Sequence, residues 1–461
     1  MTDRPLTDRI VDFITTTRRD AFPAGLEPAA VRLIIDTLGV IVAGRSGGAG
    51  QAILRYADQA CPSPDGGRTW PGVPDNAPAE LVALASSTLG HALDFDDELA
   101  GTGHPSSIMT SAILALPQRP LSGAQLIDAF IIGYETNARV AQLVGHRHYR
   151  KGWHTTSTIG GFGAVAAASR LLGLDQAQVR TALGIVGSLA SGIQRNFGTM
   201  TKPLHSGLAA RNGVLAAQLA VAGLTAADNI LDGLRGFVDI YADGGDHPGE
   251  LDHLGVDWVL LEPGATIKKY PCCYATHRPI DAVLELRREY GLVADDVEAI
   301  IDRAPTFGLT PLIHHNPRTG LQGKFSVEYV TAAALLDGQI TLETFSDDMV
   351  NRPAIRALMA RVDAREDPRC RPEDPGAVDS SAGTGGFHEV TLRTRDGREL
   401  STRVDYPSGS PKRPLSWDDS QAKFADCLRV GGVAPAAAAH LFEDLRDLPA
   451  VADVHGLLAG I

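Results

Sequence analysis

A run of helical patterns that no strand-like alternation interrupts, from residue 105 to residue 223, most constrains the fold of this chain. Its apolar residues recur at the spacing of a helix face. The expected helices cover residues 106–116, 122–144, 157–172, 175–193 and 205–222. They are rich in Ala, Gly and Ser, so helix axes can approach closely although each side chain buries little area. Residues 27–45 and 79–93 carry the same periodicity, and the first part of the chain is therefore predicted to be all-helical.

The pattern changes after residue 264, where segments with strand-like alternation appear. VEAIIDRAP and FHEVTLRTRDGRELSTRVDYP alternate in this way, and Asp396-Gly397 lies between two such runs as a hairpin signal. Helical patterns return from residue 411 to the end of the chain. The remaining expected helices lie near residues 278–290, 326–336 and 351–362.

A chain of 461 residues exceeds the size of one ordinary core, and its 44% hydrophobic residues are enough for two. We therefore predict a mainly α fold. A large all-helical domain is built from both chain ends, residues 1–266 and 406–461, and a smaller α+β domain, residues 267–405, lies between them in the sequence.

The net charge of -13 argues against a nucleic-acid or anionic-membrane partner, because either would call for a basic face. The N-terminal segment has charges throughout and no continuous apolar region, so it does not resemble a signal peptide. No window reaches the roughly 18 uninterrupted apolar residues of a membrane-spanning helix. These observations predict a cytoplasmic protein without a membrane partner.

The five cysteines show neither CxxC spacing nor a Cys/His ladder suited to zinc or an iron–sulfur cluster. We expect reduced thiols and no metal site. The glycine-rich GGFGAVAAASR lies inside a helical run without a preceding strand, so it lacks the geometry of a dinucleotide-binding turn. No cofactor is expected.

Residues 91–107, HALDFDDELAGTGHPSS, combine four carboxylates with two histidines on a segment whose glycines break any helix. Asp94 and His104 on this bend could meet at one cleft, where their electrostatics would decide which proton each holds. We expect His104 to transfer protons, and Asp94 to orient it or to hold its charge.

Simpler interpretations of these residues exist. Acidic residues near helix ends are often caps, and His-Pro-Ser can be an ordinary helix start with Pro at the first position. Lys202 could be a solvated lysine and His154 a hydrogen-bonded core histidine. A vicinal pair such as Cys272 and Cys273 before His277 cannot close a tetrahedral metal site as CxxC does.

Seven segments in order resemble the MmgE/PrpD superfamily, the family of 2-methylcitrate dehydratase and cis-aconitate decarboxylase. They run from about residue 30 to about residue 430. The segments are GHALDFDDELAGTGHPSS, KGWHTTSTIGGFGAVAAASRLLGL, KPLHSGLAARNGVLAAQLAVAGLT, ILDGLRGF, KKYPCCYATHRPIDA, GKFSVEYV and YPSGSPKRPLSWDDSQAKF.

The resemblance implies a large helical domain from both chain ends, a smaller α+β lid domain and a homodimer. It also implies a catalytic set, one residue from each of five motifs. That set is Asp94, His104, His154, Lys202 and His277. The substrate-binding candidates are Glu98, His205, Lys268, Lys269 and Tyr270. Glu98 stands where a threonine often follows the DFDD run, and this departure bears on the substrate.

Histidines, a lysine and an aspartate without soft metal ligands suit a substrate with several carboxylates. Such groups can stabilise the negative charge that develops when a neighbouring C–H or C–C bond breaks. Taken with the resemblance, these residues predict a cofactor-independent lyase for a small di- or tricarboxylate, which the family implies is either a 2-methylcitrate-type dehydratase or a cis-aconitate-type decarboxylase. The alternatives are an epimerase or isomerase of a carboxylate such as iminodisuccinate, and a catalytically inactive binding relative.

Overall fold

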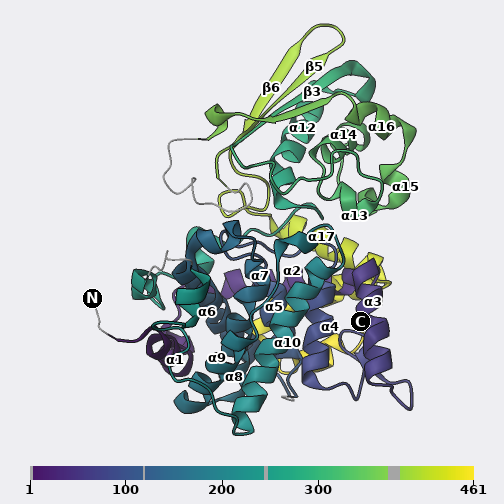
Figure 1. Cartoon of the computed structure of the whole chain (residues 1–461). Helices are drawn as coiled ribbons and strands as arrows, with labels where there is room; N and C mark the ends of the chain where they lie inside the picture. Colours follow the sequence, from purple (N-terminus) through teal and green to yellow (C-terminus); the bar gives the residue numbers. More distant parts are fainter. Residues whose placement is uncertain (1–3, 118–119, 243–247, 372–384) are drawn as a thin grey trace. The chain divides into compact units, whose positions relative to one another are not determined.

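The structure is a computed structural model that describes residues 4–117, 120–242, 248–371 and 385–461 (Figure 1). Helices make up 58% and strands 8% of it, so the prediction of a mainly α fold is confirmed. The chain divides into two compact units. The first combines Met1–Ile267 with Ser416–Ile461, and the second is Lys268–Leu415.

The second unit extends ten residues beyond the predicted boundary at residue 405. Its last segment is held to its own helix α12 (His277–Tyr290), because the Ser408 amide donates to the buried Asp281 carboxylate at 2.6 Å. Arg413 adds an ion pair to Glu285 at 2.8 Å. These polar contacts are long-range in the sequence and leave no periodic pattern from which the boundary could be located.

Helices account for nearly all regular structure described in the first unit. Helices α1, α3 and α11 were not among the individual helices predicted, and neither was a short hairpin of β1 (Arg68–Thr69) with β2 (Val73–Pro74). Helix α10 begins earlier than predicted, which places Lys202 in its first turn. The helices are α1 (Leu6–Thr16), α2 (Leu26–Gly44), α3 (Gly48–Ala60), α4 (Ala79–His91), α5 (Pro105–Leu114), α6 (Gly123–Arg150), α7 (Thr155–Thr158), α8 (Gly160–Leu172), α9 (Gln176–Ser188), α10 (Thr201–Val221), α11 (Phe237–Tyr241), α17 (Trp417–Val430), α18 (Pro435–Arg446) and α19 (Val454–Leu458).

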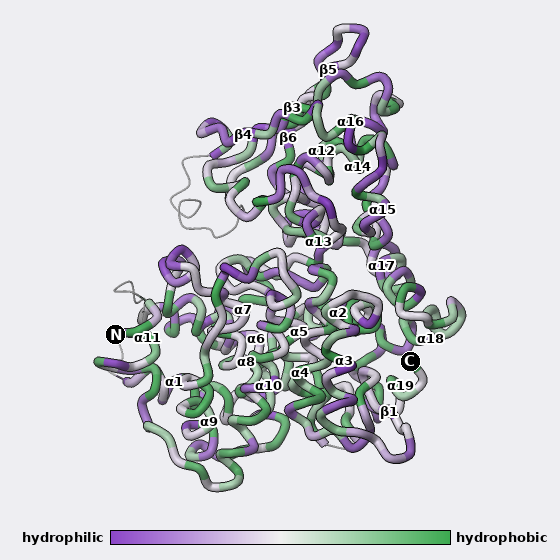
Figure 2. The backbone as a smooth tube through the Cα atoms, turned by 45° about the vertical axis from the view of Figure 1, so that its right-hand side comes forward, coloured by the Kyte–Doolittle hydropathy of each residue, from purple (hydrophilic) through white to green (hydrophobic). Residues whose placement is uncertain are grey.

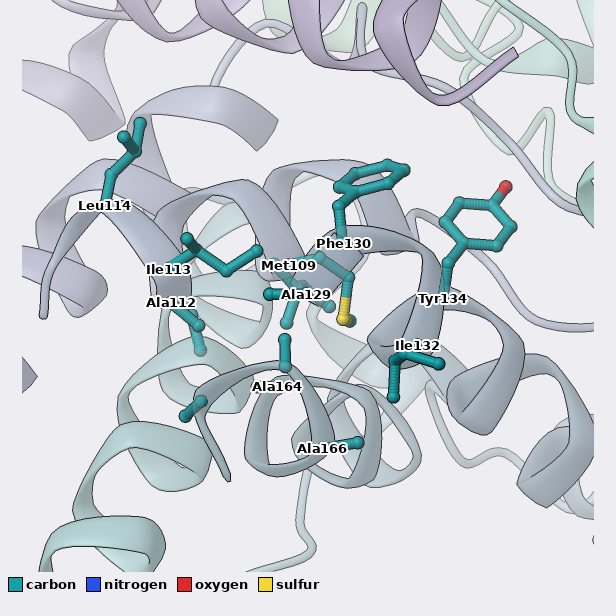
Figure 3. Close-up of a cluster of buried hydrophobic side chains, with 14 of the residues drawn as sticks. Met109, Ala112, Ile113, Leu114, Ala129, Phe130, Ile132, Tyr134, Ala164 and Ala166 are labelled. Carbon is teal, nitrogen blue, oxygen red and sulfur yellow. The ribbon is translucent and has the colours of Figure 1, made fainter. Parts of the chain in front are cut away.

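Small residues let the central helices pack at close range. A Cβ atom placed on Gly207 of α10 would lie 2.1 Å from the Thr88 hydroxyl of α4, and one on Gly213 would lie 2.3 Å from the Ala164 Cβ of α8. Apolar side chains of α5, α6 and α8 fill the neighbouring core (Figure 3). Because α4 and α5 both belong to this core, the loop that joins them is held inside the unit.

The second unit is α+β, with a four-stranded sheet in the order β4-β3-β5-β6. The expected hairpin of β5 (His388–Thr394) and β6 (Glu399–Val404) is present with antiparallel register, and its turn at Asp396-Gly397 is hydrophilic (Figure 2). Helix α12 packs on this hairpin, while α14 packs on β4. The other elements are β3 (Val297–Ala304), β4 (Val362–Glu366), α13 (Gly320–Gly323), α14 (Val327–Asp337), α15 (Asp347–Val350) and α16 (Pro353–Met359).

Strand β4 pairs in parallel with β3 and was not predicted. Its sequence, VDARE, has little apolar alternation, and the prediction extended a helix to residue 362 instead. A short polar edge strand is specified by its partner more than by its own residues. Among the described residues, no helix is both long and apolar enough to cross a membrane.

We expect Gly213→Ala to destabilise the protein, although alanine normally stabilises a helix interior by about 1 kcal/mol relative to glycine. The added methyl group would lie 2.3 Å from the Ala164 Cβ and 2.6 Å from the Val165 amide. Overpacking of this kind costs about 1–3 kcal/mol, so the midpoint of thermal unfolding should fall. Gly460→Ala, which meets nothing within 4 Å, is the control. A midpoint of Gly213→Ala equal to or above wild type would contradict the packing argument.

Candidate active site

The segment between α4 and α5 turns sharply and carries its polar side chains into the first unit. Asp94 has a φ of 54°, a left-handed conformation that aspartate tolerates better than most residues. Gly103 has a φ of 101°, and a Cβ there would lie 2.3 Å from the Thr156 hydroxyl. The predicted bend is therefore present, and its glycine is required by both backbone conformation and space.

Lys202 and Asp94 form a buried ion pair, with the Lys202 Nζ atom 2.7 Å from Asp94 Oδ1. The two residues are only 7% and 6% exposed. The Nζ atom also lies 5.7 Å from the centre of the Phe197 ring. The interpretation of Lys202 as a solvated surface lysine is thus wrong, because a buried ammonium of this kind is retained only with a close partner.

His104 is the residue immediately before α5, and its ring is oriented by the backbone. Its Nδ1 atom lies 2.7 Å from the carbonyl oxygen of Asp97, which can only accept a hydrogen bond. The Nδ1 atom therefore carries a proton in both charge states of the ring. Nε2 is then the nitrogen that gains or loses a proton, as a proton-transferring group requires.

His91, at the end of α4, forms a second imidazole–carboxylate pair with Asp96. The His91 Nδ1 atom lies 2.9 and 3.0 Å from the two carboxylate oxygens of Asp96. The rings of His91 and His104 are in contact, with centroids 4.4 Å apart. The prediction did not include His91 or Asp96, although both stand in the stretch from which Asp94 and His104 were chosen.

His154 and His205 form a neutral pair in the same unit. Their Nδ1 atoms are 2.9 Å apart, so one ring donates and the other accepts. Burial and the Lys202 charge lower the pKa of His154 well below its usual value, and burial lowers that of His205 to about 4. Both rings are neutral near pH 7, and the expectation that charged histidines neutralise substrate carboxylates does not apply to these two.

Asp97 lies behind His104 and is completely buried. Its carboxylate accepts hydrogen bonds from the Ser106 amide at 3.1 Å and from the Ser106 hydroxyl at 2.7 Å. Tyr134 donates a third, at 3.2 Å. Burial and the nearby Asp96 charge nevertheless raise the pKa of Asp97 to about 8, so this group favours its neutral form near pH 7.

Among the described residues, one group of side chains could coordinate a cation. The ligand atoms of His91, Asp94, Asp96 and His104 lie within 4.8 Å of one another. The Asp94 carboxylate already contacts Lys202, and the Asp96 carboxylate accepts from His91 and from the Ser107 hydroxyl at 3.1 Å.

Glu98 is half-buried and pairs through its backbone with Thr266, with both N–O distances 2.8 Å. This pairing joins the polar loop to the last residues of the first unit's long segment. The backbone of Glu98 is therefore held in place next to Asp97, on the loop that also carries Asp94.

The second unit holds the other predicted residues. His277 begins α12 and is fully buried, with its ring centroid 5.2 Å from those of Tyr270 and Tyr274. Tyr270 donates to Asp281 at 2.6 Å, and burial with this carboxylate raises its pKa. Lys268 is 1% exposed, whereas Lys269 is on the surface.

Lys324 is a buried lysine of the second unit that the prediction did not single out, although it stands in the quoted segment GKFSVEYV. Its Nζ atom donates to the Pro271 carbonyl at 2.6 Å and so fixes the loop before His277. Burial raises the pKa of the neighbouring Cys272 thiol to about 12, despite the nearby Lys268 and Lys324 charges. The thiol stays protonated, as expected for a packing residue.

Comparison with known proteins places these two units in a family. The MmgE/PrpD N-terminal domain matches residues 8–249, and the MmgE/PrpD C-terminal domain matches residues 270–447. The chain belongs to the MmgE/PrpD family. The resemblance inferred from the seven sequence segments is thereby confirmed.

Several relatives that this MmgE/PrpD chain is similar to are named cis-aconitate decarboxylase. The cis-aconitate decarboxylase of Mus musculus is 32% identical over 415 residues, which cover 87% of this chain and 82% of the relative. That of Homo sapiens is 31% identical over 410 residues, covering 85% and 81%. The cis-aconitate decarboxylase of Aspergillus terreus is 27% identical over 360 residues, covering 72% and 71%.

The first unit of this MmgE/PrpD protein combines a buried cation with a histidine whose proton-exchanging nitrogen is defined. Lys202 can stabilise a carboxylate near the reacting carbon, and His104 can give or take the proton. His154 and His205 supply neutral donors and acceptors beside them. The arrangement suits a reaction that passes through a carbanion next to a carboxylate.

We expect Lys202→Ala to raise KM strongly, because a substrate carboxylate would lose its buried cation at a cost of about 2–5 kcal/mol. Steady-state kinetics on the substrate measures this effect, and the thermal midpoint shows whether the unpaired Asp94 has also destabilised the fold. Lys412→Ala, which removes an exposed lysine, is the control. A Lys202→Ala enzyme with wild-type kcat/KM would place Lys202 outside the substrate site.

Proposed function

We propose that this chain is a carboxy-lyase that removes CO2 from cis-aconitate, or a close unsaturated tricarboxylate, without a cofactor. The observation that carries the proposal is the cluster of Lys202, Asp94 and His104 inside a chain of the MmgE/PrpD family. Family membership and relatives named cis-aconitate decarboxylase support a lyase acting on a tricarboxylate. The epimerase and the inactive relative are not favoured.

The substrate, the described residues and solvent account for every bond, electron pair and proton of the proposed reaction. The C–C bond to one carboxylate breaks, CO2 leaves, and the electron pair stays on a carbon conjugated with the double bond and a second carboxylate. Lys202 stabilises the charge that reaches this carboxylate. His104, in its charged form, gives the Nε2 proton to the carbon and becomes neutral, and solvent returns the proton afterwards. The product is an unsaturated dicarboxylate.

Glu98 makes a hydro-lyase of the 2-methylcitrate type the second candidate. A carboxylate beside the Asp94 loop would repel a third carboxylate of the substrate, whereas it could accept a hydrogen bond from a substrate hydroxyl. The same cluster would then stabilise a carbanion while a hydroxyl group leaves as water. The two reactions share the intermediate and differ in the leaving group.

An NMR assay in D2O distinguishes these reactions. The purified enzyme is incubated separately with cis-aconitate, 2-methylcitrate, citrate and iminodisuccinate. We expect cis-aconitate to yield CO2 and a dicarboxylate with one deuterium at the protonated carbon, and we expect EDTA to leave the rate unchanged. Water loss from 2-methylcitrate would favour the second candidate, and deuterium exchange without loss of mass would favour an epimerase. Binding without turnover would contradict an enzymatic role.

We expect His104→Gln to lower kcat by roughly a hundredfold or more, the usual scale for removing a general acid or base. Glutamine can still donate a hydrogen bond but cannot transfer a proton, so the enzyme should fold and bind substrate. Circular dichroism and the thermal midpoint provide the folding control. A folded His104→Gln enzyme with nearly normal kcat would move proton transfer to His154 or His277.

Three further properties belong to this proposal. His277 of the second unit acts in the catalytic set, with Lys268, Lys269 and Tyr270 as substrate-binding candidates. The protein is a homodimer, as the family resemblance implies. It works in the cytoplasm, which is supported by its five free cysteines.

A further inference from the structure

Three buried carboxylates of the polar loop, Asp94, Asp96 and Asp97, lie near His104, and they differ in their partners. Asp94 contacts the Lys202 ammonium at 2.7 Å, so its charge is matched by a cation. Asp97 favours its neutral form near pH 7, because burial and the Asp96 charge raise its pKa. The remaining carboxylate, Asp96, has its Oδ1 atom 3.9 Å from the His104 Nδ1 atom.

Neutral donors surround the Asp96 carboxylate. His91 donates to both carboxylate oxygens, and the Ser107 hydroxyl donates to Oδ2 at 3.1 Å. Ser107 is held in turn by the Ser206 hydroxyl at 3.1 Å, and Ser206 by that of Ser87 at 2.7 Å. Hydrogen bonds to a carboxylate favour its charged form. The chain of hydroxyls from α4, α5 and α10 therefore fixes the place of this charge.

His91 is neutral in this arrangement. It is 1% exposed, and burial lowers its pKa. Its Nε2 atom has no hydrogen-bond partner within the described residues, so a second ring proton would be buried without an acceptor. His91 thus contributes a hydrogen bond and no charge to Asp96.

We propose that Asp96 is the carboxylate whose charge keeps a proton on His104, and that His91 is a positioning residue that holds Asp96 in place. The proposal rests on the function proposed above only in giving His104 the proton-transfer role. An anion within about 4–6 Å of an imidazole stabilises the imidazolium by 1–3 pKa units. The charged form of His104 that decarboxylation needs is then present at neutral pH.

Other titratable groups near His104 come from several elements of the first unit. They are Asp94 and Asp97 on the same loop, His91 on α4, His154 before α7, and Lys202 and His205 on α10. The histidines of this group are neutral near pH 7 and Lys202 pairs with Asp94. The neutral histidines therefore add no charge near His104, and the charges of Lys202 and Asp94 oppose each other.

The titration of His104 itself tests the proposal without requiring turnover. In full-length protein labelled with 13C at histidine Cε1, the His104 signal is assigned by its absence from His104→Gln. We expect Asp96→Asn to lower the midpoint of this titration by about one pH unit or more. In an active enzyme, the basic limb of the kcat profile should move down by the same amount.

Two matched variants complete the test. Asp94→Asn combined with Lys202→Met removes one charge of each sign, and it should move the midpoint less than Asp96→Asn. His91→Asn places an amide nitrogen near the position of Nδ1, so it should keep Asp96 in place and retain a nearly wild-type midpoint. His91→Leu lacks the hydrogen-bond donor, so it should not retain the wild-type midpoint of the His104 titration.

An unchanged midpoint in Asp96→Asn would overturn the proposal, and so would a larger shift in the Asp94→Asn/Lys202→Met protein. A shift in His91→Asn as large as that in Asp96→Asn would overturn the positioning role. Since the readout is a titration, a protein that fails to decarboxylate cis-aconitate would contradict the proposed function while leaving this test intact.

Discussion

Burial of charge inside a helical core is the constraint on which the first unit depends. Asp94, Asp96 and Asp97 are no more than 6% exposed, and burying such polar groups without hydrogen-bond partners, above all the charged ones, costs far more than a domain can lose. Each is therefore supplied with its own donor: an ammonium, an imidazole, or the amide and hydroxyl at the start of α5. Donors from α4, α5 and α10 therefore converge on this loop.

The same constraint explains why the two chain ends form one unit. Lys423, on the C-terminal helix α17, is 9% exposed and pairs with Asp36 of α2 at 2.7 Å. Its ammonium also donates to the Phe95 carbonyl at 2.8 Å, within the polar loop. A residue more than three hundred positions away thus helps to fix the loop that carries Asp94. The C-terminal return is part of the support of the site as well as part of the fold.

Periodicity predicted the central helices of the first unit because they bury apolar side chains, but it left out α1 and α3. The Asp-Gly turn predicted the β5–β6 hairpin through a local backbone requirement. Features that depend on distant partners were missed. Strand β4 takes its conformation from β3, and the end of the second unit is set by Asp281. At the site, the sequence pattern did not distinguish His91 from an ordinary residue at the end of a helix. Its importance follows from Asp96 five positions later, which the turn of the loop brings back to its ring.

Proton transfer and the choice of leaving group depend on different charged residues in the proposed function. In the proposed function, Lys202 and His104 would serve any carbanion formed beside a carboxylate, whether CO2 or water leaves. Under the same proposal, the leaving group would depend on which substrate atoms are held away from the loop, to which Glu98 adds a carboxylate. Because like charges repel most strongly where water is excluded, a single side chain of this kind can change the preferred substrate while the proton-transfer residues stay the same.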